Sequence, residues 1–222
     1  MRAGHRQVVW DELLSRTGEE SRLNATFQAF LTIACLLAAV GVVTNSPVTI
    51  VGAMVVGPEF GPLAAIAVGL VLRRWDLVRR AGIALAVGFP LAMLVTAGGA
   101  LLGSVTGLFD RTMVLDAHQV DFVFTVGPFS LIVALLAGAA GMLSMTSAKS
   151  AALVGVFISV TTVPAAGYAA VAAVLGEWER CAQSAGQLVV NLVGIVVAAA
   201  LVLAVRSRKN RANDPGRPLS TG

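Results

Sequence analysis

Six long runs of apolar residues, separated by short polar segments, set the pattern of this chain. About 20 apolar residues in helical conformation cross a hydrocarbon core about 30 Å thick, so each run is close to the length of one membrane span. Because lipid offers backbone amides no hydrogen-bond partner, each run is expected to be helical. The pattern predicts an all-α, polytopic membrane bundle with six spans, at residues 26–43, 48–72, 81–102, 122–143, 151–175 and 187–205.

The chain also resembles itself at an offset of 103 residues. Gly52 falls on Gly155 and Trp75 falls on Trp178, with seven identities over the 26 positions from 51 to 76. Each half holds three predicted spans, and an odd number of spans forces the second half to enter the membrane in the opposite orientation. The self-similarity predicts an inverted three-plus-three repeat, with units at about 26–102 and 122–205.

Composition and charge agree with a membrane location. Apolar residues make up 57% of the 222, charged residues 13%, and the mean hydropathy is +0.84, which is more apolar surface than a soluble domain of this size buries. Fourteen of the 16 Lys and Arg residues lie on one side of the predicted membrane: before residue 26, in 73–80, at Lys149 or after residue 205. The loops on the other side carry only Arg111 and Arg180. The positive-inside rule then predicts that both termini are cytoplasmic, with the chain in the cell (inner or plasma) membrane.

The same distribution divides the chain into three parts. Residues 1–25 are expected to form an amphipathic cytoplasmic arm, 26–205 the six-span domain, and 206–222 a basic, disordered cytoplasmic tail. The basic residues do not alternate with aromatic residues along one face, so no nucleic-acid partner is expected. The lipid bilayer is the expected environment, and a homo-oligomer the expected assembly.

Prolines and glycines interrupt two of the predicted helices. The second span contains Gly57, Pro58, Gly61 and Pro62 near its middle, and each proline removes an amide donor from the helix. At the equivalent depth the fifth span contains Thr161, Thr162 and Pro164. Paired breaks at matching positions of two halves indicate a midplane binding site in transporter-like folds, although a proline kink can also serve packing alone.

Glu59 is the acidic residue predicted deep within a span. A charge at that depth is costly, so such residues face the bundle interior or water and usually mark ion or proton pathways. No Lys, Arg or His lies in another predicted span, so opened backbone amides, a cation, a proton or water remain as its partner. The alternative is a wet re-entrant dip or a pairing at an interface.

Other polar residues within the spans have a second reading. Asn191, Thr125, Ser130 and Ser159 could line a polar route, but such side chains more often bond a neighbouring helix or their own backbone. The small residues at 137–141 and 98–100 are expected to serve close helix contact.

No pattern of catalytic chemistry was found. The chain lacks a P-loop, a nucleophile elbow and a His-Glu-x-x-His motif, and Cys35 and Cys181 are too far apart to predict a disulfide or a zinc site. We therefore expect no enzyme activity, no cofactor and no metal centre.

Several stretches resemble a known family. Residues 21–26, residues 44–58 continuing to Gly61-Pro62, and weaker pieces at 137–141, 152–155, 163–164 and 191–193 are similar to the domain of unknown function 389 family, over about 21–205. The chain departs from that family's pattern at Glu59, where members often carry an apolar residue, and at Ala165, where they carry a second proline. The resemblance implies a multi-span bacterial membrane domain and brings no established activity, cofactor or substrate.

Two functions are consistent with these features. The first is a small secondary transporter or channel for a small solute or ion, with a pathway lined by Glu59, Gly57, Pro58, Gly61, Pro62, Thr161, Thr162, Pro164 and Asn191. The second is a non-transporting scaffold or sensor, in which the breaks set packing and the arm or basic loops recruit a cytoplasmic partner.

Overall fold

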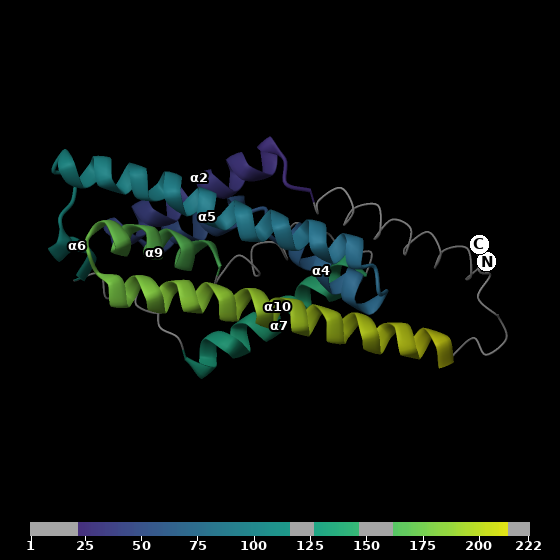
Figure 1. The fold of residues 1–222 in the computed structure, drawn as a ribbon. Helices are drawn as coiled ribbons and strands as arrows, with labels where there is room; N and C mark the ends of the chain where they lie inside the picture. The colour runs from purple at the N-terminus through teal and green to yellow at the C-terminus, as the bar shows by residue number, and fades with distance from the viewer. Residues whose placement is uncertain (1–21, 116–126, 147–161, 213–222) are drawn as a thin grey trace.

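The computed structural model describes residues 22–115, 127–146 and 162–212, and all regular secondary structure within them is helical. The predicted all-α class is confirmed. The helices are α2 (Ala25–Val43), α3 (Pro47–Val56), α4 (Phe60–Val71), α5 (Trp75–Val105), α6 (Arg111–Leu115), α7 (Pro128–Met145), α9 (Val163–Val174) and α10 (Trp178–Ala212) (Figure 1).

Three of these helices, α2, α5 and α10, are long and apolar enough to cross a membrane. The pair α3–α4, bent by 54° at a short break, makes a fourth span if it is counted as one. Helices α7 and α9 are apolar but shorter. The count of six spans stays a prediction, because residues 116–126 and 147–161 lie outside the described part, as do most of the predicted arm and tail.

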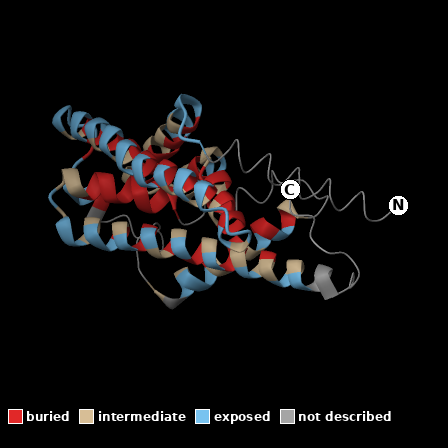
Figure 2. Cartoon of the chain, turned by 45° about the vertical axis from the view of Figure 1, so that its right-hand side comes forward, coloured by how far each residue is buried: buried red, intermediate tan, exposed pale blue. Residues whose placement is uncertain are grey.

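The described residues expose an unusual amount of apolar surface. The outward faces of the long helices are exposed, as the pale blue colour in Figure 2 shows. The exposed residues include many large apolar ones, among them Phe30, Leu94 and Leu201. The interior is mostly apolar but also holds several polar side chains: Glu59, Thr96, Ser144, Thr162, Ser184, Gln187 and Asn191. Exposing so much apolar surface to water is unfavourable, so this arrangement indicates a protein embedded in a membrane.

The long helices α5 and α10 run in opposite directions (Figure 1). Helix α4 leads through a short turn into α5, and α9 leads through a short turn into α10. We call these two turns the Trp75 end and the Trp178 end of the bundle, after the residues that begin α5 and α10. The two indoles are 65% and 70% exposed, as expected of side chains at a membrane–water interface.

The shorter helices α4 and α9 connect the centre to these ends. Each has 12 residues, or about 18 Å of helical rise, so their starts lie about midway between the Trp75 end and the Trp178 end. Helix α4 packs against α5 and α10, and α9 packs against α10, α5 and α2. The starts of α4 and α9 are therefore enclosed by the long helices.

Helix starts recur 103 residues apart. Helices α2 and α7 begin at residues 25 and 128, α4 and α9 at 60 and 163, and α5 and α10 at 75 and 178. The turns that follow α4 and α9 also correspond, because Arg73 and Gly176 both have a positive φ, of 57° and 76°. The recurrence first seen in the sequence thus extends to helix boundaries and turn geometry.

Two helices begin earlier than their hydropathy predicted. Helix α5 starts at Trp75 instead of residue 81, and α10 starts at Trp178 instead of residue 187. Their first turns contain Asp76 and Glu179, which lower the local hydropathy. Acidic residues suit the positive end of a helix dipole, so the helices continue past the apolar run.

Glycines allow the closest helix contacts. A Cβ at Gly138 of α7 would lie 2.3 Å from the carbonyl oxygen of Ile195 in α10. A Cβ at Gly167 of α9 would lie 3.0 Å from the carbonyl oxygen of Cys35 in α2. The small residues at 137–141 therefore serve packing, as expected, whereas a Cβ at Gly98 would meet nothing within 4 Å.

Candidate functional site

The predicted break in the second span is present, between α3 and α4. Helix α3 ends at Val56, and Gly57 is extended, with φ −61° and ψ 125°. The ring of Pro58 disfavours helical geometry in the preceding residue, which explains this conformation. Gly61 and Pro62 are buried in the first turn of α4. Glu59 is thereby placed at the start of a new helix in the centre of the bundle.

Glu59 is hydrogen-bonded across the molecule. Its Oε1 accepts a 2.7 Å bond from the hydroxyl of Thr162, and both side chains are 0% exposed. Each residue occupies the N-cap position of its helix, Glu59 of α4 and Thr162 of α9, yet neither side chain caps its own helix. Two predicted pathway residues are therefore brought together directly.

The start of a helix carries a partial positive charge and unpaired backbone amides. The carboxyl group of Glu59 lies where two helices, α4 and α9, both begin. This arrangement supplies positive potential without a basic side chain, and none occurs in the described spans at this depth. The structure thus explains how the acid is accommodated.

A second polar cluster joins α7 and α10. The Ser130 hydroxyl donates to Oδ1 of Asn191 at 3.2 Å, and Nε2 of Gln187 donates to the Ser130 hydroxyl. Gln187 is 1% exposed and Asn191 is fully buried. Asn191, which the sequence grouped with Glu59, is therefore held by Ser130 at the interface between α7 and α10.

The two clusters lie at a similar depth. The Ser184 hydroxyl of α10 donates to the carbonyl of Ala165 in α9 at 2.9 Å. The turn at 175–177 makes α9 and α10 antiparallel. The residue three positions after Ser184 in α10 therefore lies at the same level as the residue three positions before Ala165. Gln187 therefore lies at the level of Thr162.

Helix α2 contributes the buried Cys35 thiol to the same core cluster as Val163 of α9. The tight contact of Gly167 with the α2 backbone brings this part of α2 against α9. Among the described residues, no group of three or more His, Cys, Asp or Glu side chains is placed to hold a metal ion.

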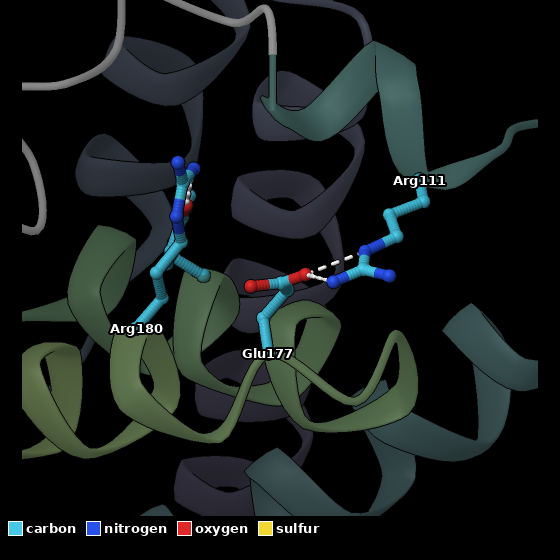
Figure 3. A network of polar contacts seen from close by, with 4 residues as sticks. Arg111, Glu177 and Arg180 are labelled. Atoms are coloured by element: carbon cyan, nitrogen blue, oxygen red, sulfur yellow. Dashed lines mark hydrogen bonds and ion pairs between the residues drawn. The ribbon is translucent and has the colours of Figure 1, made fainter.

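A polar network lies at the Trp178 end. Arg111 of α6 forms an ion pair with Glu177, which lies in the turn between α9 and α10 (Figure 3). Arg180, in the first turn of α10, donates to the hydroxyl of Tyr168 at 3.2 Å. Tyr168 is fully buried, so this bond leads from the end of the bundle into its interior.

A separate apolar cavity of about 450 Å³ opens between α2 and α5 near the Trp178 end. Its lining includes Ile33, Val40 and Leu108, and neither Glu59 nor Thr162 belongs to it. The polar site is therefore distinct from this cavity.

The sequence located part of this arrangement. Pro164 lies at the beginning of α9, so it starts a helix, and whether another helix precedes it falls outside the described residues, as does Thr161. Gln187, Ser184 and Tyr168 were missed. Gln187 lies at the edge of the predicted last span, and the low hydropathy of Glu179 and Arg180 conceals the earlier start of α10.

The fold and site define a helical membrane protein with a broken helix pair and a buried acid at its centre. A family model described as domain of unknown function (DUF389) matches residues 54–197, and the chain belongs to this family. The uncharacterised protein MJ0678 of Methanocaldococcus jannaschii is 22% identical over 196 residues, 88% of this chain. The chain spans 59% of the length of that relative. No solved structure matches the chain.

Proposed function

We propose that this chain is a small secondary transporter or channel whose solute or ion site lies at Glu59, and that it is not an enzyme. The observation that carries the proposal is the bond from Thr162 to Glu59 where α4 and α9 begin. Ionisable residues in the middle of a membrane are costly and usually mark substrate or ion pathways. Discontinuous helices that meet near the midplane are a common way to build such a site.

We also propose that the two halves of the chain form an inverted repeat, an arrangement found in many secondary transporters. The helix starts recur 103 residues apart, and α5 and α10 run in opposite directions. Glu59 and Thr162 are 103 residues apart, the same as the repeat offset, so they occupy equivalent positions in the two units. Equivalent residues related by a two-fold axis can contact each other only close to that axis. The proposed axis therefore passes beside the acid, at the interface between the two units.

The distribution of basic residues supports an orientation. Arg73, Arg74, Arg79 and Arg80 surround the Trp75 end, whereas Arg111 and Arg180 lie toward the Trp178 end. By the positive-inside rule, we place the Trp75 end in the cytoplasm, in a multi-pass protein of the cell membrane with both termini inside. A homo-oligomer in the bilayer is part of the same proposal.

The proposal is tested by flux into liposomes. Vesicles containing the purified protein are screened with proton- and ion-sensitive dyes for solute movement driven by a pH gradient. Glu59→Gln keeps the shape of the side chain but cannot ionise, and is expected to reduce gradient-driven flux about tenfold or more. Glu179→Gln, at an exposed acid in the first turn of α10, is the matched control and is expected to leave flux unchanged.

Two results would count against the proposal. If Glu59→Gln and Asn191→Ala both keep the flux of the wild-type protein, these residues are not part of the pathway. Absence of flux for every solute would favour the second function, a scaffold or sensor.

The complete burial of Glu59 and Thr162 is the observation that favours the scaffold. Glu59→Cys, Thr162→Cys and Asn191→Cys separate the two functions. A small water-soluble thiol reagent reacts at these positions if a hydrated route reaches them, and fails to react if the bundle is dry throughout.

A further inference from the structure

We infer that the Trp75 end of the bundle binds the headgroups of anionic phospholipids. Four exposed arginines carry the inference: Arg73, Arg74, Arg79 and Arg80. They lie in the turn after α4 and in the first turns of α5, and we call them the arginine patch. The inference goes beyond the proposed function, because it requires neither transport nor the proposed orientation of the chain.

The described part of the chain leaves most of the charge of the arginine patch without a partner. Asp76 is the single acid that this part places at the Trp75 end, and its carboxylate lies 3.9 Å from Nε of Arg74. Both side chains are more than half exposed, so this ion pair is weak. No described acid pairs with the side chain of Arg73, Arg79 or Arg80. Four arginines and one aspartate leave a net charge of +3, which favours a negatively charged ligand.

The arginine patch lies where the lipid-facing surface ends. On α5, Trp75, Arg79, Ile83 and Val87 follow one another at intervals of four residues, so they share one face of the helix. All four are exposed. Helical side chains lean toward the N-terminus, so Arg79 extends toward the level of Trp75. This face presents an aromatic ring and a cation at the headgroup level and aliphatic side chains further in, as a bound phospholipid requires. An acidic protein would contact the end of the bundle alone.

The Trp178 end shows that the turn itself does not require arginine. The positions 103 residues after the arginine patch carry no cation: they are Gly176, Glu177, Ala182 and Gln183. The tryptophan that starts the long helix and the positive φ in the turn recur at both ends. The arginines that do lie at the Trp178 end are engaged within the chain, Arg111 by Glu177 and Arg180 by Tyr168 (Figure 3). Exposed positive charge is therefore a property of the Trp75 end.

The backbone at Arg73 is a second observation in favour of a ligand. Its φ of 57° lies in the left-handed region, which residues with a side chain adopt at a cost in free energy. Gly176 occupies the equivalent position with φ 76°, so glycine makes the same turn without that cost. Residues held in such conformations cluster at ligand sites, and here the conformation brings a guanidinium group into the patch.

Fluorescence from one tryptophan at a time tests the inference, with the opposite end as the internal control. Trp10→Phe with Trp178→Phe leaves Trp75 as the reporter, and Trp10→Phe with Trp75→Phe leaves Trp178. The full chain is reconstituted in vesicles of phosphatidylcholine with a minor share of phosphatidylglycerol. Bromine atoms on the acyl chains of one lipid or the other quench a tryptophan that this lipid contacts.

Phosphatidylglycerol should bind beside Trp75 at least about fivefold more tightly than phosphatidylcholine, because one arginine near an anionic lipid surface accounts for about that factor. The two lipids should bind equally beside Trp178. The preference at Trp75 should fall as salt is added, since salt screens exposed charges.

Variants at both ends identify the source of the preference. Replacement of all four patch arginines by glutamine should abolish the preference at Trp75 and leave the melting temperature in neutral detergent close to that of the wild type, because the side chains are exposed. Arg73→Gly should weaken the preference without lowering the melting temperature, since glycine suits a positive φ. Ala182→Arg with Gln183→Arg, at exposed positions of α10, should raise the quenching of Trp178 by brominated phosphatidylglycerol.

Equal quenching of Trp75 by the two lipids would overturn the inference and leave the arginines only a role in orienting the chain. The same preference at both tryptophans would also overturn it, because the arginine patch would then not be the source. Inorganic phosphate and chloride at equal ionic strength separate a lipid headgroup from a free anion. Both salts should weaken the preference to the same extent, whereas selective loss in phosphate would assign the patch to free phosphate and reject the lipid.

Discussion

At the scale of single residues, the buried acid depends on one hydroxyl group. Glu59 and Thr162 come from helices about 100 residues apart, and their 2.7 Å bond is fully excluded from solvent. The sequence identified Glu59 as an acid at depth and set Thr162 at the equivalent position of the second half. It could not show that the two side chains meet, because that depends on how the halves pack.

Thr162→Val tests the strength of this bond. Valine keeps the volume of threonine but cannot donate, so a buried carboxyl oxygen loses a partner, and we expect a loss of about 2 kcal/mol in the free energy of unfolding. The measurement is thermal or denaturant unfolding in detergent. Thr162→Ser, which retains the hydroxyl, should lie much closer to wild type; an equal loss in both variants would show that packing, and not the bond, matters.

At the scale of helices, the sequence predicted interruptions better than boundaries. Gly57-Pro58 located the break between α3 and α4, because proline acts on its neighbours locally. The early starts of α5 and α10 were missed, since a hydropathy window registers where the apolar run ends and not where the hydrogen-bonded helix ends. The short helix α6 was also missed, because it lies between the predicted spans 81–102 and 122–143.

Close contact between α7 and α10 depends on Gly138. A Cβ there would lie 2.3 Å from the Ile195 carbonyl oxygen and 2.8 Å from its Cα, and backbone atoms cannot rotate away. We expect Gly138→Ala to cost about 1–3 kcal/mol through overpacking, measured by unfolding in detergent. Gly98→Ala, where the new methyl meets nothing, should be neutral or slightly stabilising because alanine favours helix.

At the scale of the whole molecule, the two ends of the bundle face opposite sides of the membrane in the proposed orientation. Cys181 is half-buried near the Trp178 end, and Asp76 is exposed near the Trp75 end. We expect a membrane-impermeant maleimide to label Cys181 in spheroplasts with intact membranes. Asp76→Cys in a Cys181→Ser background should be labelled only after the membrane is permeabilised.

Cys35 provides the internal control, because it is fully buried and should stay unlabelled in the folded protein. Labelling of native Cys181 and of the Asp76→Cys variant from the same side of the membrane would contradict the orientation. Reversed labelling would place the Trp178 end in the cytoplasm.

The exposed tryptophans make the contact between Glu59 and Thr162 sensitive to the thickness of the bilayer. Trp75 and Trp178 stand at opposite ends, and each is reached from the centre through one of the half-length helices α4 and α9. Indoles prefer the headgroup level, so lipids with shorter or longer chains pull the two anchors together or apart. A single continuous helix would respond to this change by tilting. Here the change is transmitted through α4 and α9, which begin beside the hydrogen-bonded pair Glu59 and Thr162. Acyl-chain length should therefore act on that single contact.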